Sequence, residues 1–390
     1  MDKIQVKSAG AGVYCIENGL IYYLLLKHIK TGTHWGFPKG QINKDEDESQ
    51  CAKREIFEET GIKDFTFEPD FKEKIYYTFE KDGIIKDKTV TYFLVNTPKR
   101  IIQISDEHSE FCWADYDNAL SKLTTENDVS ILKKAKDYIN MKMADAIIVS
   151  FPKAGRTWLA MILSAIFQEK YNLNYQDITS LEKITYPCPQ LPNITLIHED
   201  NPQIKTPNEL STNKNKLLKK KIIFLIRDPR DIIVSWYFHL AHRKQKYKGE
   251  LSAFLNIPIG GFNTIIKYYN IWNKYKKHPH FLKVSYENLM NNSIDEIRKI
   301  LNFLSINISD EDIKKAIDKC SFEKMRKLEE QNIFNVNRLK PGDINDPESF
   351  KLRRGKIRGY KDYLSENQID ELNSYLQNLN LDDRRMLNIP

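Results

Sequence analysis

Short apolar runs alternate with polar residues in the first third of the chain, and this period of two predicts a segment rich in β-strands. The expected strands lie at 9–14, 20–28, 74–79, 89–95 and 110–113. The turn residues Glu17-Asn18-Gly19 separate the first two strands. Patterns with the helical period predict one helix over about 48–59, ending at Gly61, and a second over about 129–138.

The pattern changes at residue 144, where a short apolar run rich in β-branched residues predicts a buried strand over 144–151. Strands then alternate with longer helical patterns, which are expected at 157–167, 231–241, 262–275, 294–303 and 311–319. This alternation is typical of an α/β sheet. No linker rich in Gly or Ser stands at the change, so we expect a short junction near 141–144 between two domains, 1–142 and 143–390.

The composition is that of a globular protein of two or three domains, because 41% of the 390 residues are apolar and 29% are charged. No apolar run approaches the roughly 18 residues of a membrane helix, and the first residues lack the apolar core of a signal peptide. The five cysteines are scattered and form no C-x-x-C pair, which argues against a disulfide framework or a thiolate zinc site. We therefore expect a cytoplasmic protein without a membrane partner.

The net charge of +7 is unevenly distributed along the chain. Residues 1–140 hold 20 basic and 24 acidic residues, whereas the remainder holds 40 basic and 29 acidic residues. This division indicates one unit that binds cations and one that binds anions. The alternative is that lysine-rich surfaces only keep the protein soluble.

Three carboxylates, Glu55, Glu58 and Glu59, fall on or near one face of the first predicted helix. Like charges at this spacing destabilise a helix, so we expect a binding partner that offsets the repulsion. Hard divalent cations such as Mg²⁺ favour carboxylate and water oxygens. A metal ion here would bridge phosphate oxygens and activate water, whereas the alternative is a solvated acidic face.

The segment that carries these carboxylates resembles the Nudix box, G-x5-E-x7-R-E-U-x-E-E-x-G-U, in which U is a bulky aliphatic residue. It matches every specified position, with Gly40, Glu46, Arg54, Glu55, Ile56, Glu58, Glu59, Gly61 and Ile62. The resemblance implies an α/β/α sandwich with a mixed sheet. It also implies a hydrolase of nucleoside polyphosphates that uses Mg²⁺ or Mn²⁺.

The sequence around the box is most similar to the asymmetrical bis(5′-nucleosyl)-tetraphosphatases, because H-W-G-F-P-K-G at 34–40 matches their H-W-x-x-P-K-G motif. Messenger-RNA decapping enzymes share W-G-F-P-K-G, so a decapping-like hydrolase is an alternative. The resemblance implies four metal-binding carboxylates, Glu55, Glu58, Glu59 and Glu107. It also implies that Glu58 and Glu107 are catalytic. It implies that Lys39 and Lys88 hold phosphates and that Tyr77 and Phe111 stack on a purine, although Tyr77 is equally compatible with a core position.

A second candidate site follows the strand at 144–151. Residues 152–158, Pro-Lys-Ala-Gly-Arg-Thr-Trp, place a glycine turn between a strand and a helix N-terminus, which together bind anions. The spacing G-x-x-x-x-G-K-[ST] is absent, so a nucleoside triphosphatase is not expected. Two further elements are suited to bind phosphate: Arg227 with Ser235, and the basic loop at 353–360. Each alone is compatible with a surface ion-pair cluster, but together they indicate a ligand with anionic groups at two places.

These segments resemble the sulfotransferases that use 3′-phosphoadenosine 5′-phosphosulfate (PAPS), over about 144–376. The resemblance implies a P-loop-like α/β fold with a central parallel sheet. The residues implied to bind PAPS are Lys153, Gly155, Arg156, Thr157, Trp158, Arg227, Ser235, Tyr286, Ser321, Phe322, Arg353, Arg354 and Gly355. Trp158 and Phe322 are expected to enclose adenine, and Tyr286 and Ser321 to hydrogen-bond its edge.

In this chemistry a sulfuryl group passes in line from PAPS to an acceptor hydroxyl or amine. Lys153 is expected to stabilise the charge on the leaving phosphate oxygen. His198 is the candidate general base, with Glu199 and Asp200 as alternatives and a structural role for His198 left open. The remaining histidines near the second motif, His239 and His242, are expected at the surface or in helix packing.

We therefore expect a bifunctional enzyme with a hydrolase domain and a sulfotransferase domain. One alternative is that the first domain is a non-catalytic nucleotide sensor that controls the second. Another is that the basic second domain binds RNA while the first trims its 5′ end. The arginines fall in nucleotide motifs rather than in an aromatic-interleaved stripe, so we expect small nucleotides and a sulfate acceptor as partners rather than nucleic acid. Neither the acceptor nor the oligomeric state can be read from the sequence.

Overall fold

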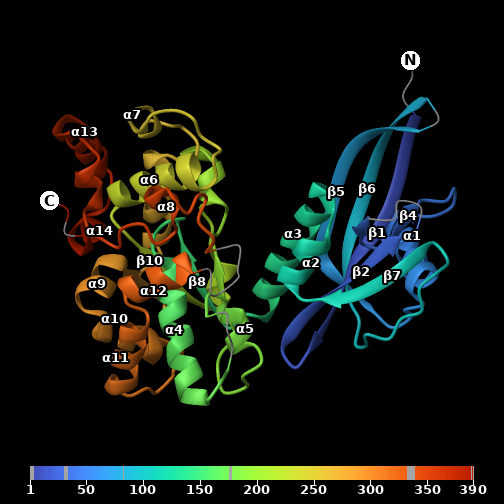
Figure 1. Cartoon of the computed structure of the whole chain (residues 1–390), viewed down its shortest axis with the longest axis horizontal. Coiled ribbons are helices and arrows are strands. Elements are labelled where there is room, and N and C mark those ends of the chain that lie inside the picture. Colours follow the sequence, from blue (N-terminus) through green and yellow to red (C-terminus); the bar gives the residue numbers. More distant parts are fainter. Residues whose placement is uncertain are drawn as a thin grey trace. The chain divides into compact units, whose positions relative to one another are not determined.

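The structure is a computed structural model of the chain, and it describes residues 4–29, 34–81, 83–174, 178–331, 339–387 and 389. The chain forms two compact units, Met1–Met143 and Ala144–Pro390 (Figure 1). Within the described residues, no helix combines the length and the apolar character that crossing a bilayer requires.

A mixed sheet forms the centre of the first unit. Its described strands are β1 (Ile4–Glu17), β2 (Leu20–His28), β3 (Trp35–Gly36), β4 (Lys39–Gln41), β5 (Thr66–Lys81), β6 (Ile84–Asn96) and β7 (His108–Ala114). They follow the order β3-β2-β1-β6-β5, while β4 also pairs with β1 and β7 with β2. β1 is parallel to β6 and antiparallel to β2 and β4. The helices of this unit are α1 (Glu48–Thr60), α2 (Tyr116–Lys122) and α3 (Glu126–Met143).

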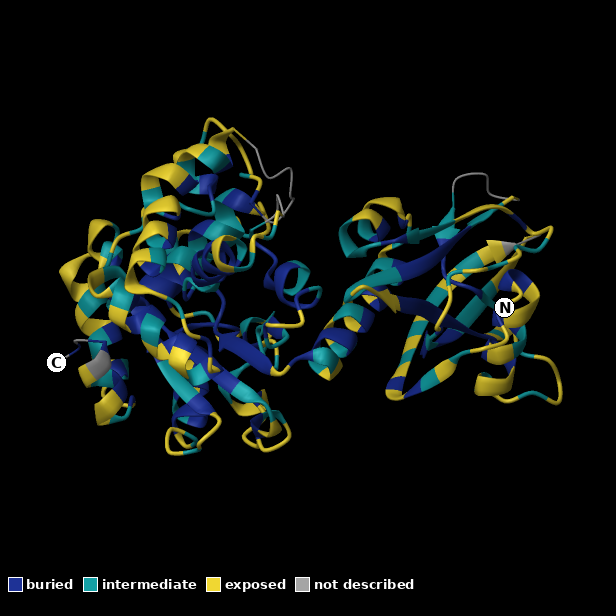
Figure 2. Ribbon diagram, turned by 90° about the horizontal axis from the view of Figure 1, so that it is seen from below, coloured by how far each residue is buried: buried dark blue, intermediate teal, exposed yellow. Residues whose placement is uncertain are grey.

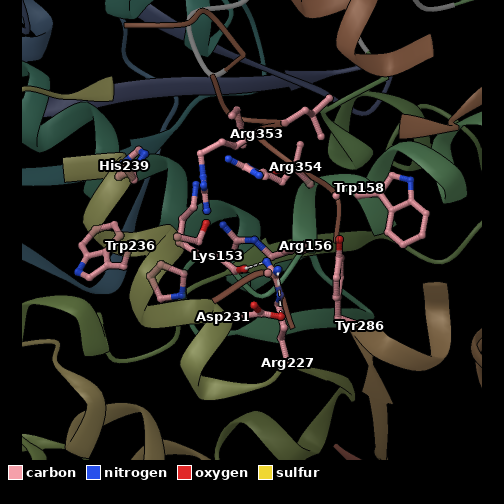
Figure 3. A pocket seen from close by; sticks show the side chains of 18 of the residues that line it. Lys153, Arg156, Trp158, Arg227, Asp231, Trp236, His239, Tyr286, Arg353 and Arg354 are labelled. Atoms are coloured by element: carbon pink, nitrogen blue, oxygen red, sulfur yellow. Dashed lines mark hydrogen bonds and ion pairs between the residues drawn. The ribbon is translucent and has the colours of Figure 1, made fainter. Parts of the chain in front are cut away.

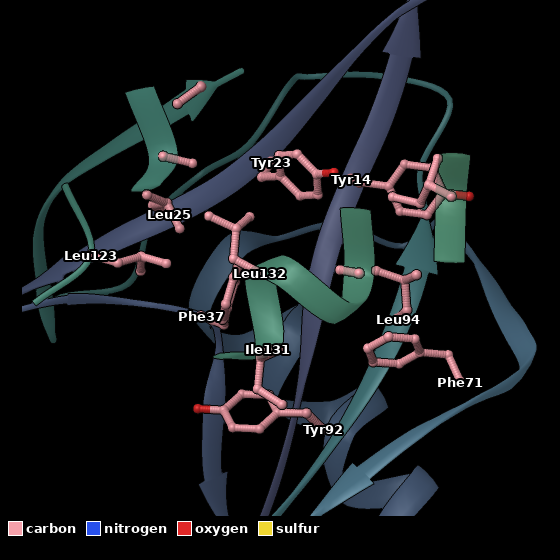
Figure 4. Close-up of a cluster of buried hydrophobic side chains, with 14 of the residues drawn as sticks. Tyr14, Tyr23, Leu25, Phe37, Phe71, Tyr92, Leu94, Leu123, Ile131 and Leu132 are labelled. Carbon is pink, nitrogen blue, oxygen red and sulfur yellow. The ribbon is translucent and has the colours of Figure 1, made fainter. Parts of the chain in front are cut away.

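Successive side chains of each strand point to opposite faces of this sheet. On one face, Leu24 and Leu26 of β2 pack in one cluster with Ile56 of α1. On the other face, Leu25 of β2 belongs to a larger cluster with Leu132 of α3 (Figure 4). Helices therefore cover both faces, and the expected α/β/α sandwich with a mixed sheet is confirmed.

A sheet of parallel strands forms the centre of the second unit. Its described strands are β8 (Ala146–Ser150), β9 (Ile194–Ile197), β10 (Lys221–Ile226) and β11 (Phe281–Ser285), in the order β11-β10-β8-β9. Every neighbouring pair among them is parallel. All residues of β8 are buried, and Figure 2 shows dark blue buried residues concentrated along the strands. The expected parallel α/β sheet is confirmed.

The described helices of the second unit are α4 (Arg156–Tyr171), α5 (Leu181–Thr185), α6 (Pro229–Phe238), α7 (Leu251–Phe254), α8 (Phe262–Asn273), α9 (Tyr286–Asn291), α10 (Ser293–Leu304), α11 (Asp310–Lys319), α12 (Phe322–Glu330), α13 (Glu366–Leu376) and α14 (Leu381–Met386). Helix α4 follows β8 and carries a continuous buried stretch from Leu159 to Phe167. Such a helix is hydrophobic nearly all round, because it is packed inside the unit.

Most predicted elements are present, but several boundaries differ. The strand predicted at 20–28 coincides with β2, whereas the other four predicted strands of the first unit are longer in the structure. Helix α2 was not expected. Helix α6 ends at Phe238 rather than at 241, because the chain widens into a π-helical turn over His239–Arg243.

Candidate active sites

Helix α1 presents the acidic face of the first unit, and its caps fix where it begins and ends. The side chain of Asp47 accepts hydrogen bonds from the backbone N–H groups of Ser49 and Gln50. The helix ends at Gly61, whose φ of 70° is a left-handed conformation that favours glycine. The predicted end of this helix at Gly61 is confirmed.

Arg54 holds three carboxylates around this helix. Its Nε donates to Oε1 of Glu46 at 2.5 Å, and its Nη1 donates to Glu55 at 2.5 Å and to Glu58 at 2.8 Å. One guanidinium therefore offsets part of the like-charge repulsion between the glutamates. It also fixes the orientation of Glu55 and Glu58 relative to each other.

The glutamates beneath strand β4 are tightly packed. A Cβ atom added to Gly40 would lie 1.9 Å from Oε1 of Glu55, so glycine allows the backbone to pass over this carboxylate. Glu59 is only 5% exposed, and its burial raises its pKa to about 8. Its buried Oε2 atom makes no hydrogen bond. A carboxylate in this state gains from a nearby cation.

A divalent cation fits the donor chemistry of this cluster. Among the described residues, no three His, Cys, Asp or Glu side chains are arranged so that together they could hold a metal ion. Burial is the largest cause that raises the pKa values of Glu55 and Glu59, and the negative charge of Glu107 is a smaller cause in the same direction. Carboxylate oxygens with one buried atom unpaired are suited to Mg²⁺ or Mn²⁺.

The two lysines expected to hold phosphates lie near each other. Burial, followed by the charge of Lys39, lowers the pKa of Lys88. The two aromatic residues, in contrast, lie on different strands: half-buried Tyr77 on β5 and 44% exposed Phe111 on β7. Strands β6, β1 and β2 lie between their strands in the order of the sheet. That the two rings stack on one purine stays a prediction.

The turn after β8 forms the centre of the candidate site in the second unit (Figure 3). Lys153 has a φ of 73° and Gly155 a φ of 99°, so the backbone reverses sharply before α4 begins. A Cβ atom on Gly155 would lie 2.5 Å from the ring of Tyr286. Only glycine fits this position, and the turn leaves the first N–H groups of α4 available for an anion.

Lys153 lies within a cluster of positive charges. Burial, and then the charges of Arg243, Arg353 and Arg227, lower its pKa to about 7. A buried cation surrounded by cations is unfavourable without a counter-ion. The binding of an anion would reverse this effect and restore the charge of Lys153.

Arg227 connects the turn after β8 to the C-terminal basic loop. Its Nη1 donates to the carbonyl oxygen of Lys153 at 3.2 Å, and its Nη2 donates to that of Lys356 at 3.3 Å. Its guanidinium lies 4.4 Å from the centroid of the Tyr286 ring. Its buried Nε makes no hydrogen bond, so Arg227 can still donate to a ligand.

Aromatic rings line one side of this site. The indole N–H of Trp158 donates to the carbonyl oxygen of Cys320 at 2.9 Å, and its ring centroid is 5.9 Å from that of Tyr286. A Cβ atom on Gly355 would lie 2.4 Å from the ring of Phe322. Gly355 therefore lets the basic loop approach the third ring closely.

These elements enclose a cavity of about 400 Å³. The cations that line it are Lys153, Arg156, Arg227, Arg243, Lys351, Arg353, Arg354 and Lys356. All residues expected to bind PAPS line this cavity except Ser321. The hydroxyl of Ser321 caps α12 by accepting from the backbone N–H of Lys324. Its O–H can still donate, so its contact with adenine stays a prediction.

His198 lines the cavity, and both of its ring nitrogens have partners. Nδ1 lies 2.9 Å from the carbonyl oxygen of Ser150, and Nε2 lies 3.0 Å from Nη2 of Arg156. Burial and then the charge of Arg156 hold its pKa well below the usual range. The alternative bases Glu199 and Asp200 do not line the cavity.

Both alternatives are engaged elsewhere. Glu199 pairs with Lys214 at 2.6 Å, and Asp200 accepts from Lys205 and from the backbone N–H of Ser211. Of the three candidate bases, His198 is therefore the one that the fold brings to the cavity.

Comparison with known families identifies both units. Residues 143–386 match the family model of the sulfotransferase domain. The chain belongs to the sulfotransferase family. Residues 7–135 of this sulfotransferase match the family model of the NUDIX domain, so an N-terminal NUDIX domain precedes the sulfotransferase domain. Both resemblances inferred from the motifs are confirmed, and both domains are of enzyme families.

Several relatives of the two domains are known. An amine sulfotransferase of Oryctolagus cuniculus is 23% identical over 259 residues, which cover 64% of this chain and 85% of the relative. The solved structure of a C. elegans Ap4A hydrolase binary complex is 33% identical and covers 34% of this chain and 97% of its own, with a TM-score of 0.32. A mouse sulfotransferase complexed with PAP is 20% identical and covers 63% of this chain and 88% of its own, with a TM-score of 0.44.

The cavity of the sulfotransferase domain also contains residues that the sequence analysis missed. His239 was expected at the surface or in helix packing, but it lines the cavity with its ring stacked on Trp236 at 5.2 Å between centroids. The spacing from Ser235 to His239 was the available signal, because residues four apart share a helix face. Gln203 and Lys351 also line the cavity, and no motif marks either of them.

Proposed function

We propose that this chain is a bifunctional enzyme. Its sulfotransferase domain transfers a sulfuryl group from PAPS to a hydroxyl or amine, and its NUDIX domain hydrolyses a nucleoside polyphosphate of the dinucleoside tetraphosphate type. The observation that carries the first activity is the cationic cavity around Lys153, with aromatic rings on one side and a glycine turn at a helix N-terminus.

Each cation has a distinct role in this proposal. Arg227 and Ser235 bind the 3′-phosphate, while Lys153 and the turn at Gly155 bind the phosphosulfate. The acceptor oxygen or nitrogen attacks sulfur, the bond from sulfur to the phosphate oxygen breaks, and 3′-phosphoadenosine 5′-phosphate (PAP) leaves. Lys153 stabilises the negative charge that develops on the leaving oxygen.

His198 takes the acceptor's proton in this proposal. Its Nε2 is engaged by Arg156, so this contact must break before His198 can act as a base. The anionic groups of the donor compete for the Arg156 guanidinium, because charge-assisted hydrogen bonds are stronger than a bond to a neutral imidazole. Donor binding would thereby release the base.

In the NUDIX domain, Glu55, Glu58, Glu59 and Glu107 would hold Mg²⁺ or Mn²⁺. The ion would neutralise phosphate charge and activate water. Lys39 and Lys88 bind the remaining phosphate oxygens. The observation that supports this activity is the crowded carboxylate cluster, whose Glu59 Oε2 is buried without a hydrogen-bond partner.

Calorimetry with two nucleotides tests the donor site. PAP should bind the full chain at least tenfold more tightly than adenosine 5′-phosphate, because only PAP carries the 3′-phosphate. Arg227→Ala should abolish this difference, whereas Arg298→Ala, which removes an exposed cation paired with Asp295 and Asp310, should preserve it. Equal affinity of the wild type for both nucleotides would overturn the assignment.

A further inference from the structure

The cavity of the sulfotransferase domain has a second end that none of the nucleotide motifs explains. In Figure 3, Trp236 and His239 lie on the opposite side of Lys153 from Trp158 and Tyr286. The imidazole of His239 stacks on the Trp236 indole with an interplanar angle of 16°. This end of the cavity is therefore lined by two stacked flat rings, the apolar indole of Trp236 and the polar imidazole of His239.

Some buried polar atoms of the described cavity lining make no hydrogen bond. Besides Nε of Arg227, they include Nδ1 of His239 and Oε1 of Gln203. Leaving a buried polar atom unpaired is unfavourable, so such atoms in a cavity indicate the position of a ligand. An amide oxygen only accepts hydrogen bonds, so the ligand group that contacts Gln203 must donate one.

The same end of the cavity is positively charged. Burial, then the charges of Lys153, Arg243, Lys244 and Lys351, lower the pKa of His239 to about 2, so its ring is neutral and can either accept or donate a hydrogen bond. Three of these four cations, all except Lys244, line the cavity itself.

No carboxylate is available in this lining to balance a cationic ligand. Among the described residues, Asp231 is the acidic side chain that lines the cavity. Its two oxygens accept from the backbone N–H groups of Arg358 and Tyr360 at 2.9 Å each, and it also lies 3.5 Å from Arg227. A protonated amine placed here would meet like charges without a counter-charge.

We propose that the end of the cavity at Trp236 and His239 accepts a hydroxyl compound that carries no positive charge, with His239 Nδ1 and Gln203 Oε1 as its hydrogen-bond partners. This proposal rests on the proposed sulfotransferase function and makes its acceptor class specific. An aromatic or other flat group next to the hydroxyl packs on the Trp236 indole. A cationic amine of the same shape is disfavoured by Arg243 and Lys351, which line the cavity, act on His239 and have no part in the proposed donor binding.

Three matched probes test the proposal on the full chain saturated with PAP. Benzyl alcohol, 4-(hydroxymethyl)benzoate and benzylamine have similar shapes and differ in charge, and ligand-observed NMR titration gives their affinities. We expect benzyl alcohol and the benzoate to bind at least tenfold more tightly than benzylamine. Benzylamine binding as tightly as the alcohol, or binding by none of the three probes, would overturn the proposal.

Variants test the named hydrogen bonds. His239→Leu and Gln203→Leu should each weaken benzyl alcohol binding about fivefold to tenfold, while His239→Asn, which keeps a polar atom near Nδ1, should stay within about threefold of wild type. His242→Leu is the matched control, because His242 pairs with Asp346 at 2.8 Å and does not line the cavity. PAP affinity should not change in any variant that folds, as checked by thermal melting. Unchanged probe affinity in His239→Leu overturns the proposal, whereas failure of PAP to bind the wild type overturns the proposed function itself.

Discussion

Lys153 should take up a proton when PAP binds. In the free protein its pKa is lowered from 10.5 to about 7, because it is buried among Arg243, Arg353 and Arg227. The phosphates of PAP favour the charged form, so binding moves the pKa back toward 10.5. The bound state then holds more protons than the free state between these two values, and affinity must fall as the pH rises through this window.

The magnitude follows from the two pKa values. At pH 8 about nine-tenths of the free protein has a neutral Lys153, so binding should take up about 0.9 proton. Between pH 7 and pH 9 the affinity for PAP should fall about 50-fold, which corresponds to about 2.3 kcal/mol. Most of this change lies above the range in which phosphate groups titrate, near pH 6.

Isothermal titration calorimetry measures the uptake directly. Titrations at pH 8 in Hepes and in Tris, which differ in ionisation enthalpy, give the number of protons from the slope of the observed enthalpy. Lys153→Arg is the matched control, because arginine keeps the charge and does not titrate in this range. Its slope should be near zero. A zero slope in the wild type, or the same slope in both proteins, would refute the role assigned to Lys153.

Four further substitutions separate the two sites and test their backbone geometry. Glu58→Gln should reduce metal-dependent hydrolysis of diadenosine tetraphosphate at least 100-fold and leave PAP affinity unchanged, and Lys153→Ala should do the reverse. Chromatography measures the hydrolysis and calorimetry measures the PAP affinity. Loss of both functions in a folded variant would contradict independent sites. Gly155→Ala should weaken PAP binding at least tenfold, because its Cβ would lie 2.5 Å from the Tyr286 ring at a φ of 99°; unchanged affinity would show that the turn tolerates a side chain. Gly40→Ala should displace a carboxylate of α1 and reduce hydrolysis at least tenfold without changing PAP affinity, which the same two assays check.

Local signals in the sequence identified the elements that carry both sites. The caps at Asp47 and Gly61 define α1, because a side-chain acceptor and a left-handed glycine are short-range features. The turn at Gly155 between β8 and α4 is equally local. Ser235 could be placed on its helix by spacing alone, and it lines the cavity as expected.

Features that depend on long-range packing could not be predicted in this way. The distance between Tyr77 and Phe111 depends on the strand order β5-β6-β1-β2-β7, which no local pattern specifies. Ser321 caps α12, a role that the motif around it did not predict. His239 was expected at the surface or in helix packing. It lines the cavity instead, because α6 gives way to a π-helical turn that begins at this residue.

We propose that one chain carries two separate sites for phosphate-bearing ligands, one using a metal ion and the other using cationic side chains. A crystal structure of the full chain grown with PAP and Mn²⁺ tests this most directly, because anomalous scattering locates the metal. We expect PAP in the cavity, with its phosphates at Lys153 and Arg227, and a manganese peak among Glu55, Glu58, Glu59 and Glu107. PAP bound elsewhere, or a glutamate cluster without manganese, would contradict it.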